Sequence, residues 1–88
     1  LTIKDGAPFS RRDLVTFLEK NNIQTRPLFT GNILHQPAYA DMNYGNKALY
    51  PVADNIMKYS FVIGCHQGVS ASHLAYIKKT FTSFLDRY

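Results

Sequence analysis

The feature that most constrains the fold is a helix start at Ser10. Asp13 follows three positions later, which is the spacing of a capping box with Asp in place of the preferred Glu. The Asn21-Asn22 pair tolerates left-handed backbone geometry and predicts the end of the helix. Between these ends, apolar residues recur at helical spacing on one face: Leu14, Phe17 and Leu18. This amphipathic helix needs an apolar partner.

Two further helices are predicted in the second half of the chain. Pro51 suits the first turn of a short helix that ends near Tyr59, because its missing N–H is harmless there. Ser70 is the predicted cap of a final helix, whose C-terminal end is basic and so complements the helix dipole. The final helix carries an apolar stripe that we expect to be buried: Leu74, Ile77, Phe81, Phe84 and Leu85.

Three segments have strand character. Residues 1–4 alternate apolar and polar, and residues 23–29 include Pro27, which predicts an edge strand or its end. Residues 60–64 are continuously apolar, which predicts a strand covered on both faces. Residues 30–50 form a long irregular connection of a kind that is often functional. The order predicts an α+β fold, with a small, mostly antiparallel sheet and helices packed on one face.

Length and composition limit the possible functions. Eighty-eight residues suffice for a single domain, 1–88, which hides only roughly 60–65% of its surface on folding. Ten Lys and Arg against six Asp and Glu give a net charge of +4, too weak by itself to indicate a nucleic-acid partner. No apolar run approaches membrane-spanning length, so we expect no membrane association and a cytoplasmic location. The chain begins in apparent mid-strand without Met, and we expect it to be part of something longer.

Histidines and a lone cysteine raise the question of a metal or nucleophile site. Cys65 and His66 are neighbours just after a predicted strand, and only His35 and His73 remain as further ligands. A metal needs three or four converging ligands, and adjacent residues of an extended chain point to opposite faces. We therefore expect no metal site and no Cys–His nucleophile pair in this chain.

Basic pairs and aromatic residues raise the question of nucleic-acid binding. Arg11-Arg12 and Lys78-Lys79 could meet phosphates, and twelve Tyr and Phe residues could stack bases. The aromatics do not alternate along one strand, however, as they do in the common RNA-binding sheet. Solvated helix faces explain the charges better, and a stand-alone basic module for RNA or an acidic partner remains an alternative.

The most unusual segment runs from Thr25 to Tyr39, and Arg26 in it follows a predicted strand. Gly31 lets the backbone approach a ligand closely. Neutral donors and acceptors that suit a hydroxyl-rich ligand follow it: Asn32, His35 and Gln36. The alternative is structural, with Arg26 paired to a nearby carboxylate and the amides capping turns. The residues alone leave both interpretations open.

At this segment the sequence resembles the C-terminal part of the DegT/DnrJ/EryC1/StrS family, the sugar-nucleotide aminotransferases of pyridoxal-phosphate fold type I. The resemblance runs from Ile3 to about Leu85. Its strongest stretches are residues 17–20, 22–26, 28–32, 36–39, 54–57, 61–64 and 74–77. Gly31-Asn32 with Gln36-Pro37 looks most like the CDP-4-keto-6-deoxy-D-glucose 3-dehydratase branch, which serves dideoxysugar and lipopolysaccharide biosynthesis.

The resemblance implies that this chain is a small C-terminal domain whose large cofactor-binding domain lies N-terminal to Leu1. In the dehydratase branch a histidine replaces the Schiff-base lysine, the cofactor serves as pyridoxamine phosphate, and an iron–sulfur cluster and a partner reductase assist C-3 deoxygenation. Family members are commonly homodimers. Arg26 would complement the charge of the nucleotide-sugar substrate, and Asn32 and Gln36 would contact hydroxyls or position the loop. A sugar-nucleotide 4-aminotransferase is the alternative within the family.

Overall fold

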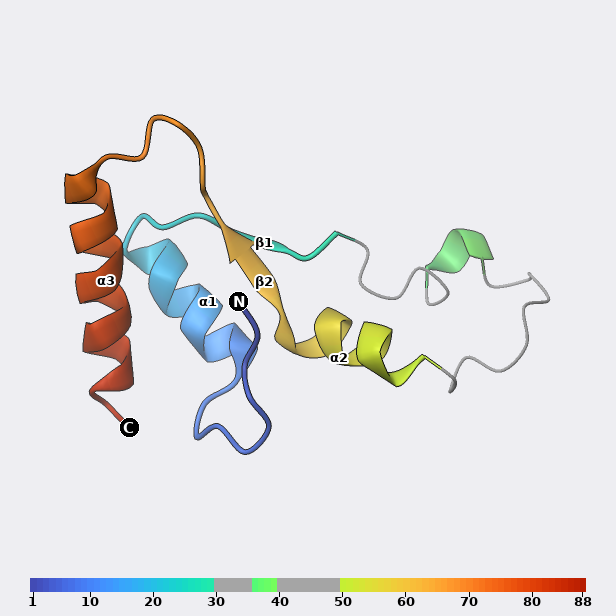
Figure 1. Cartoon of the computed structure of the whole chain (residues 1–88). Coiled ribbons are helices and arrows are strands. Elements are labelled where there is room, and N and C mark those ends of the chain that lie inside the picture. The colour runs from blue at the N-terminus through green and yellow to red at the C-terminus, as the bar shows by residue number, and fades with distance from the viewer. Residues whose placement is uncertain (30–35, 40–49) are drawn as a thin grey trace.

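The computed structural model describes residues 1–29, 36–39 and 50–88. Its elements confirm the predicted α+β class (Figure 1). In chain order they are α1 (Arg11–Lys20), β1 (Thr25–Pro27), the 3-10 turn η2 (Pro37–Tyr39), α2 (Pro51–Tyr59), β2 (Phe61–Ile63) and α3 (Ala71–Leu85).

The sheet is small and antiparallel. Strands β1 and β2 pair with Arg26 opposite Val62, and the N-terminal segment adds only an isolated antiparallel bridge between Thr2 and Ser60. Around this bridge the Leu1 amino group donates to the Phe61 carbonyl (3.0 Å), and the Phe61 N–H donates to the Leu1 carbonyl (2.9 Å). Strand β2 therefore lies between β1 and the N-terminal segment. The pairing of that segment with β2 is shorter than the strand predicted for residues 1–4.

Helix α1 is capped as the sequence predicts. The Ser10 hydroxyl accepts a hydrogen bond from the Asp13 N–H (3.1 Å), and the Asp13 carboxylate accepts from the Ser10 N–H (2.9 Å) and hydroxyl (2.8 Å). At the other end Asn22 adopts a φ of 64°, the left-handed geometry that asparagine tolerates. This box satisfies N–H groups that a helix start otherwise leaves unpaired.

The core lies between the two longer helices and the sheet. Helices α1 and α3 lie side by side, and α2 continues away from them along the line of β2 (Figure 1). Phe9 stands edge-on to Phe84, with ring centroids 5.0 Å apart. The buried apolar residues of the described segments are Leu14, Leu18, Ile23, Phe61 and Phe84.

Two predictions about burial are wrong. On α3, Leu74 and Leu85 are 59% and 48% exposed, although their spacing placed them in the buried stripe. Both residues lie near an end of α3, which has 15 residues and is about 7.5 Å longer than the 10-residue α1 that packs beside it. On β2, Val62 is 38% exposed, because it points away from the face that carries its buried neighbour Phe61.

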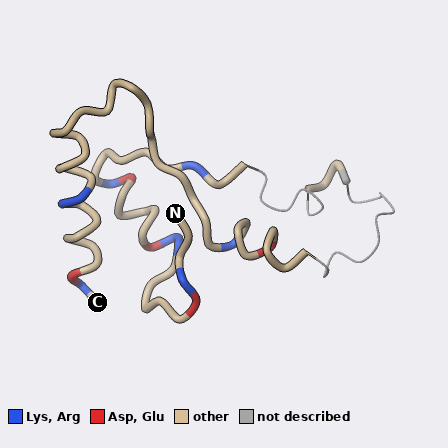
Figure 2. The backbone as a smooth tube through the Cα atoms, in the orientation of Figure 1, with Lys and Arg blue, Asp and Glu red and all other residues tan. Residues whose placement is uncertain are grey.

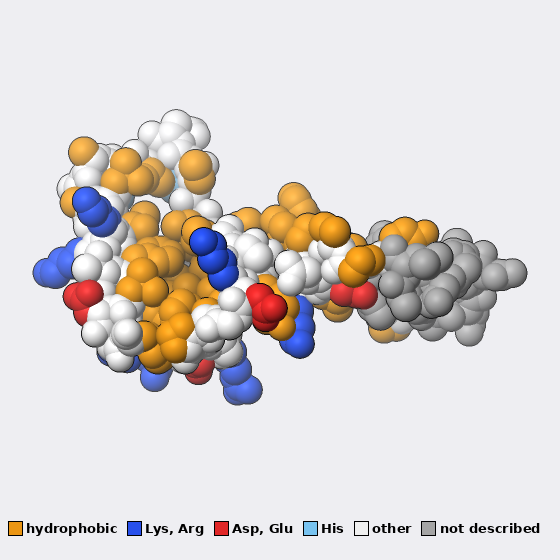
Figure 3. Space-filling view, turned by 60° about the horizontal axis from the view of Figure 1, so that its bottom comes forward, with side chains coloured by type: hydrophobic (Ala, Val, Ile, Leu, Met, Phe, Trp, Pro, Cys, Tyr) orange, Lys and Arg blue, Asp and Glu red, His pale blue; other side chains and the backbone are white. Residues whose placement is uncertain are grey.

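Apolar side chains consequently reach the surface in several places. Figure 3 shows them over the rounded part of the molecule and again along the arm that contains α2. Helix α2 itself has no buried residue. The large exposed apolar residues of the described segments are Leu1, Phe29, Tyr50, Val52, Met57, Val62, Leu74, Tyr76, Leu85 and Tyr88.

Candidate functional site

Arg26 lies at the centre of β1 with its side chain exposed. Its Nη1 donates to the carbonyl oxygen of the preceding Thr25 (2.8 Å). This bond uses one of the five guanidinium N–H groups and restrains the side chain close to its own strand. The structure thus places the predicted substrate-binding arginine in a defined position beside its own strand.

Glu19, at the end of α1, fixes the start of β1. Its Oε1 accepts hydrogen bonds from the Thr25 N–H (2.7 Å) and the Thr25 hydroxyl (2.8 Å). These bonds, and then the charge of Arg26, hold the pKa of the Glu19 carboxyl below its usual value. Helix spacing alone did not single out Glu19, because its partner lies beyond the helix end and faces it only after the chain has turned at Asn22.

A hollow of about 360 Å³ lies beside β1, between this strand and the start of α1. Every charged side chain on its wall is an arginine. The lining residues are Arg11, Arg12, Val15, Thr25, Arg26, Pro27 and Phe61. Figure 2 shows the positively charged positions at the start of α1 and on β1. The hollow is therefore a positively charged site with a partly apolar wall.

Arg11 also ties α1 to the segment between α2 and β2. Its Nη1 donates to the Met57 carbonyl (2.7 Å) and to the Ser60 carbonyl (3.1 Å). A guanidinium close to the last turn of α2 meets the negative end of the helix dipole. Arg11 was considered in the sequence only as part of a basic pair, since nothing local connects it with residues 46 and 49 positions away.

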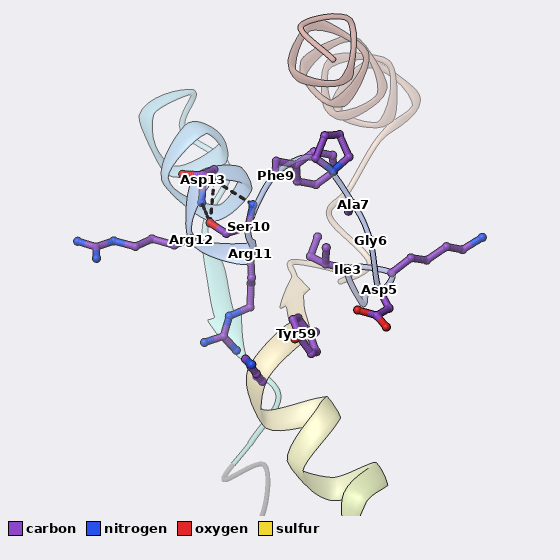
Figure 4. Close-up of a pocket in the computed structure, with 13 residues that line it drawn as sticks. Ile3, Asp5, Gly6, Ala7, Phe9, Ser10, Arg11, Arg12, Asp13 and Tyr59 are labelled. Atoms are coloured by element: carbon purple, nitrogen blue, oxygen red, sulfur yellow. Dashed lines mark hydrogen bonds between the residues drawn. The ribbon is translucent and has the colours of Figure 1, made fainter.

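A larger hollow of about 570 Å³ lies around the turn that precedes α1. Its wall mixes Asp5 and Asp13 with basic side chains. Figure 4 shows Arg11 and Arg12 leaving the first turn of α1 on the side away from Asp5, and the Asp13 carboxylate bound to Ser10. The capping box engages the N–H groups of Ser10 and Asp13 and places a negative charge at the helix start, which makes this end less favourable for a bound anion.

The structure does not test whether the other two predicted site residues lie near Arg26. Asn32 lies outside the described residues, as does His35. Gln36 is half-buried and directly precedes η2. The proposed grouping of Arg26, Asn32 and Gln36 stays a prediction.

Cys65 and the two described histidines have ordinary surroundings. Cys65 is an exposed free thiol. The Nδ1 of His66 accepts from the Gly68 N–H (3.0 Å), and the Nδ1 of His73 accepts from the Ser70 N–H (3.0 Å), completing the cap of α3. Within residues 1–29, 36–39 and 50–88, no three His, Cys, Asp or Glu side chains gather so as to hold a metal ion.

The described helices are also too short or too polar to cross a membrane. The 15 residues of α3 fall below the roughly 20 that a membrane span requires.

Comparison with known proteins tests the resemblance. The profile of the DegT/DnrJ/EryC1/StrS aminotransferase family matches residues 1–82, nearly the whole chain. The chain belongs to this family. Residues 1–82 include α1, β1, α2 and β2, so both the arginine-lined hollow and Glu19 lie within the matched region.

The chain is also similar to two curated proteins. It is 36% identical over 84 residues to the lipopolysaccharide biosynthesis protein RfbH of Salmonella typhimurium, covering 96% of this chain and 19% of that protein. It is 33% identical over 85 residues to a dTDP-4-dehydro-2,6-dideoxy-D-glucose 3-dehydratase of Saccharopolyspora spinosa, covering 97% of this chain and 18% of that protein. The chain spans about a fifth of the length of these relatives.

Proposed function

We propose that this chain is the C-terminal small domain of a pyridoxamine-phosphate-dependent sugar-nucleotide 3-dehydratase that serves dideoxysugar or lipopolysaccharide O-antigen biosynthesis. The observation that carries the proposal is the match to a lipopolysaccharide biosynthesis protein and to a sugar-nucleotide 3-dehydratase over at least 96% of the chain and at most 19% of theirs. Such coverage is what one domain of a larger enzyme produces.

The exposed apolar residues support the idea of a neighbouring domain. In the described part of the chain five buried apolar residues make a small core, while Phe29 is 92% exposed and α2 has no buried residue. Large exposed apolar patches are typical of interfaces. In the proposed enzyme the large N-terminal domain, and a second subunit of a homodimer, cover part of it.

The role proposed for this domain is to close over the substrate and orient it. Arg26 complements the negative charge of the nucleotide sugar, while Asn32 and Gln36 contact its hydroxyls or position the loop. Orientation of this kind accelerates a reaction by holding the substrate close to the reacting groups and excluding water. In this scheme the chain contributes substrate contacts and no catalytic residue.

The cofactor belongs to the rest of the enzyme. Members of this family are pyridoxal-phosphate enzymes, and the cofactor acts as the electron sink of the reaction. The hollow beside β1 has neither a lysine nor a histidine on its wall, so it offers no residue for the Schiff-base position. In our proposal that position, and with it the cofactor, lies N-terminal to Leu1.

The residue at the Schiff-base position tests the proposal. Reading the coding sequence upstream of Leu1 should reveal a large cofactor domain with histidine at that position. Lysine there would instead identify a sugar-nucleotide 4-aminotransferase, the activity after which the family is named. A reading frame without any cofactor domain would contradict both.

A further inference from the structure

We propose that the arginine-lined hollow beside β1 binds phosphoryl groups, and specifically the diphosphate of a nucleotide sugar. Arg11, Arg12 and Arg26 are the charged residues on its wall. The inference rests on the proposed function for the identity of the ligand, but the binding of a diphosphate follows from the chemistry of the hollow alone. It extends the substrate contact expected of Arg26 to two residues of α1.

Two of the three guanidinium groups are held in place before any ligand arrives. Arg11 is bound to the Met57 and Ser60 carbonyls, and Arg26 is bound to the Thr25 carbonyl. In the described part of the chain these bonds are made by Nη1 of each arginine, which leaves other N–H groups of the five for a ligand. Side chains already restrained in this way lose less conformational entropy on binding, and guanidinium forks match phosphate oxygens in two-pronged contacts.

The two carboxylates of α1 are engaged elsewhere. Asp13 binds Ser10, and Glu19 binds Thr25. Neither lies on the wall of the hollow, although the charges of Arg12 and Arg26 reach them and contribute to lowering their pKa values. The positive charge of the hollow is thus only partly offset by its surroundings.

The dimensions and the walls favour a diphosphate over a single carboxylate. A hollow of about 360 Å³ is at the lower end of small-molecule sites, and its charged groups number three against the one charge of a carboxylate. Val15, Pro27 and Phe61 supply an apolar wall that lowers the local dielectric and strengthens the attraction. A diphosphate offers several oxygens to the three guanidinium groups at once.

The test uses inorganic pyrophosphate and the 88-residue chain, so that cofactor phosphate sites do not interfere. Binding is followed by NMR through backbone and arginine Nε–Hε signals at fixed ionic strength. The variants Arg12→Gln and Arg26→Gln each remove a charge from the hollow and leave the bonds of Arg11 intact. Lys79→Gln, on the exposed surface of α3, removes the same charge elsewhere and is the matched control.

We expect pyrophosphate to shift signals at the start of α1 and on β1, and each arginine variant to weaken binding about tenfold, the value of one charge-assisted hydrogen bond. The control should bind as the unaltered chain does. Equal weakening by Lys79→Gln, or shifts scattered over the surface, would show non-specific attraction and overturn the proposal. Citrate binding as tightly as pyrophosphate would assign the hollow to acidic side chains instead.

A second titration separates the substrate from its phosphates. A nucleoside diphosphate should bind at least as tightly as pyrophosphate, with additional shifts around Phe61 or Pro27. Failure of all phosphoryl ligands would overturn this site and leave the proposed function standing, because the latter is decided by the residue upstream of Leu1. Conversely, a lysine upstream would change the reaction without affecting the diphosphate site.

Discussion

Replacing Leu18 with Ala should remove a large part of the stability of the fold. Leu18 is 0% exposed and is one of five buried apolar residues among those that the structure describes. A buried Leu→Ala change costs about 2–5 kcal/mol through lost transfer free energy and the cavity left behind. At about 0.05–0.15 kcal/mol per residue, a chain of this length has about 4–13 kcal/mol in total. We therefore expect a loss of about 3–5 kcal/mol, measured by urea unfolding.

Leu74→Ala is the matched control, with the same change of side chain on the other long helix. Leu74 is 59% exposed, so its loss should cost less than about 0.5 kcal/mol. Helix propensity favours Ala slightly over Leu and does not change this order. Equal destabilisation of both variants would show that Leu74 is buried, as helical spacing suggested, and would contradict its exposed position in the structure.

Two further predictions concern the caps and the bonds of Glu19. Ser10→Ala and Ser70→Ala should each cost about 1 kcal/mol in urea unfolding because each removes an N-cap acceptor. Ser83→Ala, on exposed α3 surface, should stay within about 0.5 kcal/mol, and equal losses at all three positions would contradict the assigned caps. The pKa of Glu19 is lower in the folded chain than its usual value of 4.5, so the ionised carboxylate stabilises the fold at pH values above 4.5. This stabilisation is lost as the pH falls through the lower folded pKa. The midpoint temperature of thermal unfolding of Glu19→Gln should approach that of the unaltered chain as pH falls below about 4.5. A difference in midpoint that stays constant between about pH 6 and about pH 3 would refute the role of the carboxylate.

Local signals in the sequence predicted much of the fold. Three features were predicted correctly: the Ser10 cap, the turn at Asn22 and the start of α2 at Pro51. Each of them depends only on residues within four positions of it along the chain. Arg26 was selected for its place next to a strand, and it does lie on β1. Such features can be predicted because their energies come from neighbouring backbone groups.

Contacts between distant segments could not be predicted in this way. Arg11 finds its carbonyl partners 46 and 49 residues away, and Glu19 meets Thr25 only because the chain reverses after α1. Helical spacing correctly showed which face of α3 is apolar, but it holds no information on how much of that face the shorter α1 covers. The exposure of Val62 could not be predicted for the same reason, because whether a face of a strand is buried depends on which other segments pack against it.

The central claim is that these 88 residues are one domain of a 3-dehydratase. The most direct measurement is mass spectrometry of the sugar product when the longer protein that contains them is incubated with CDP-4-keto-6-deoxy-D-glucose, pyridoxamine phosphate and a reductant. We predict loss of the C-3 oxygen with the longer protein and no turnover with the 88-residue chain alone. A 4-amino product from the longer protein, or turnover by the isolated chain, would contradict the claim.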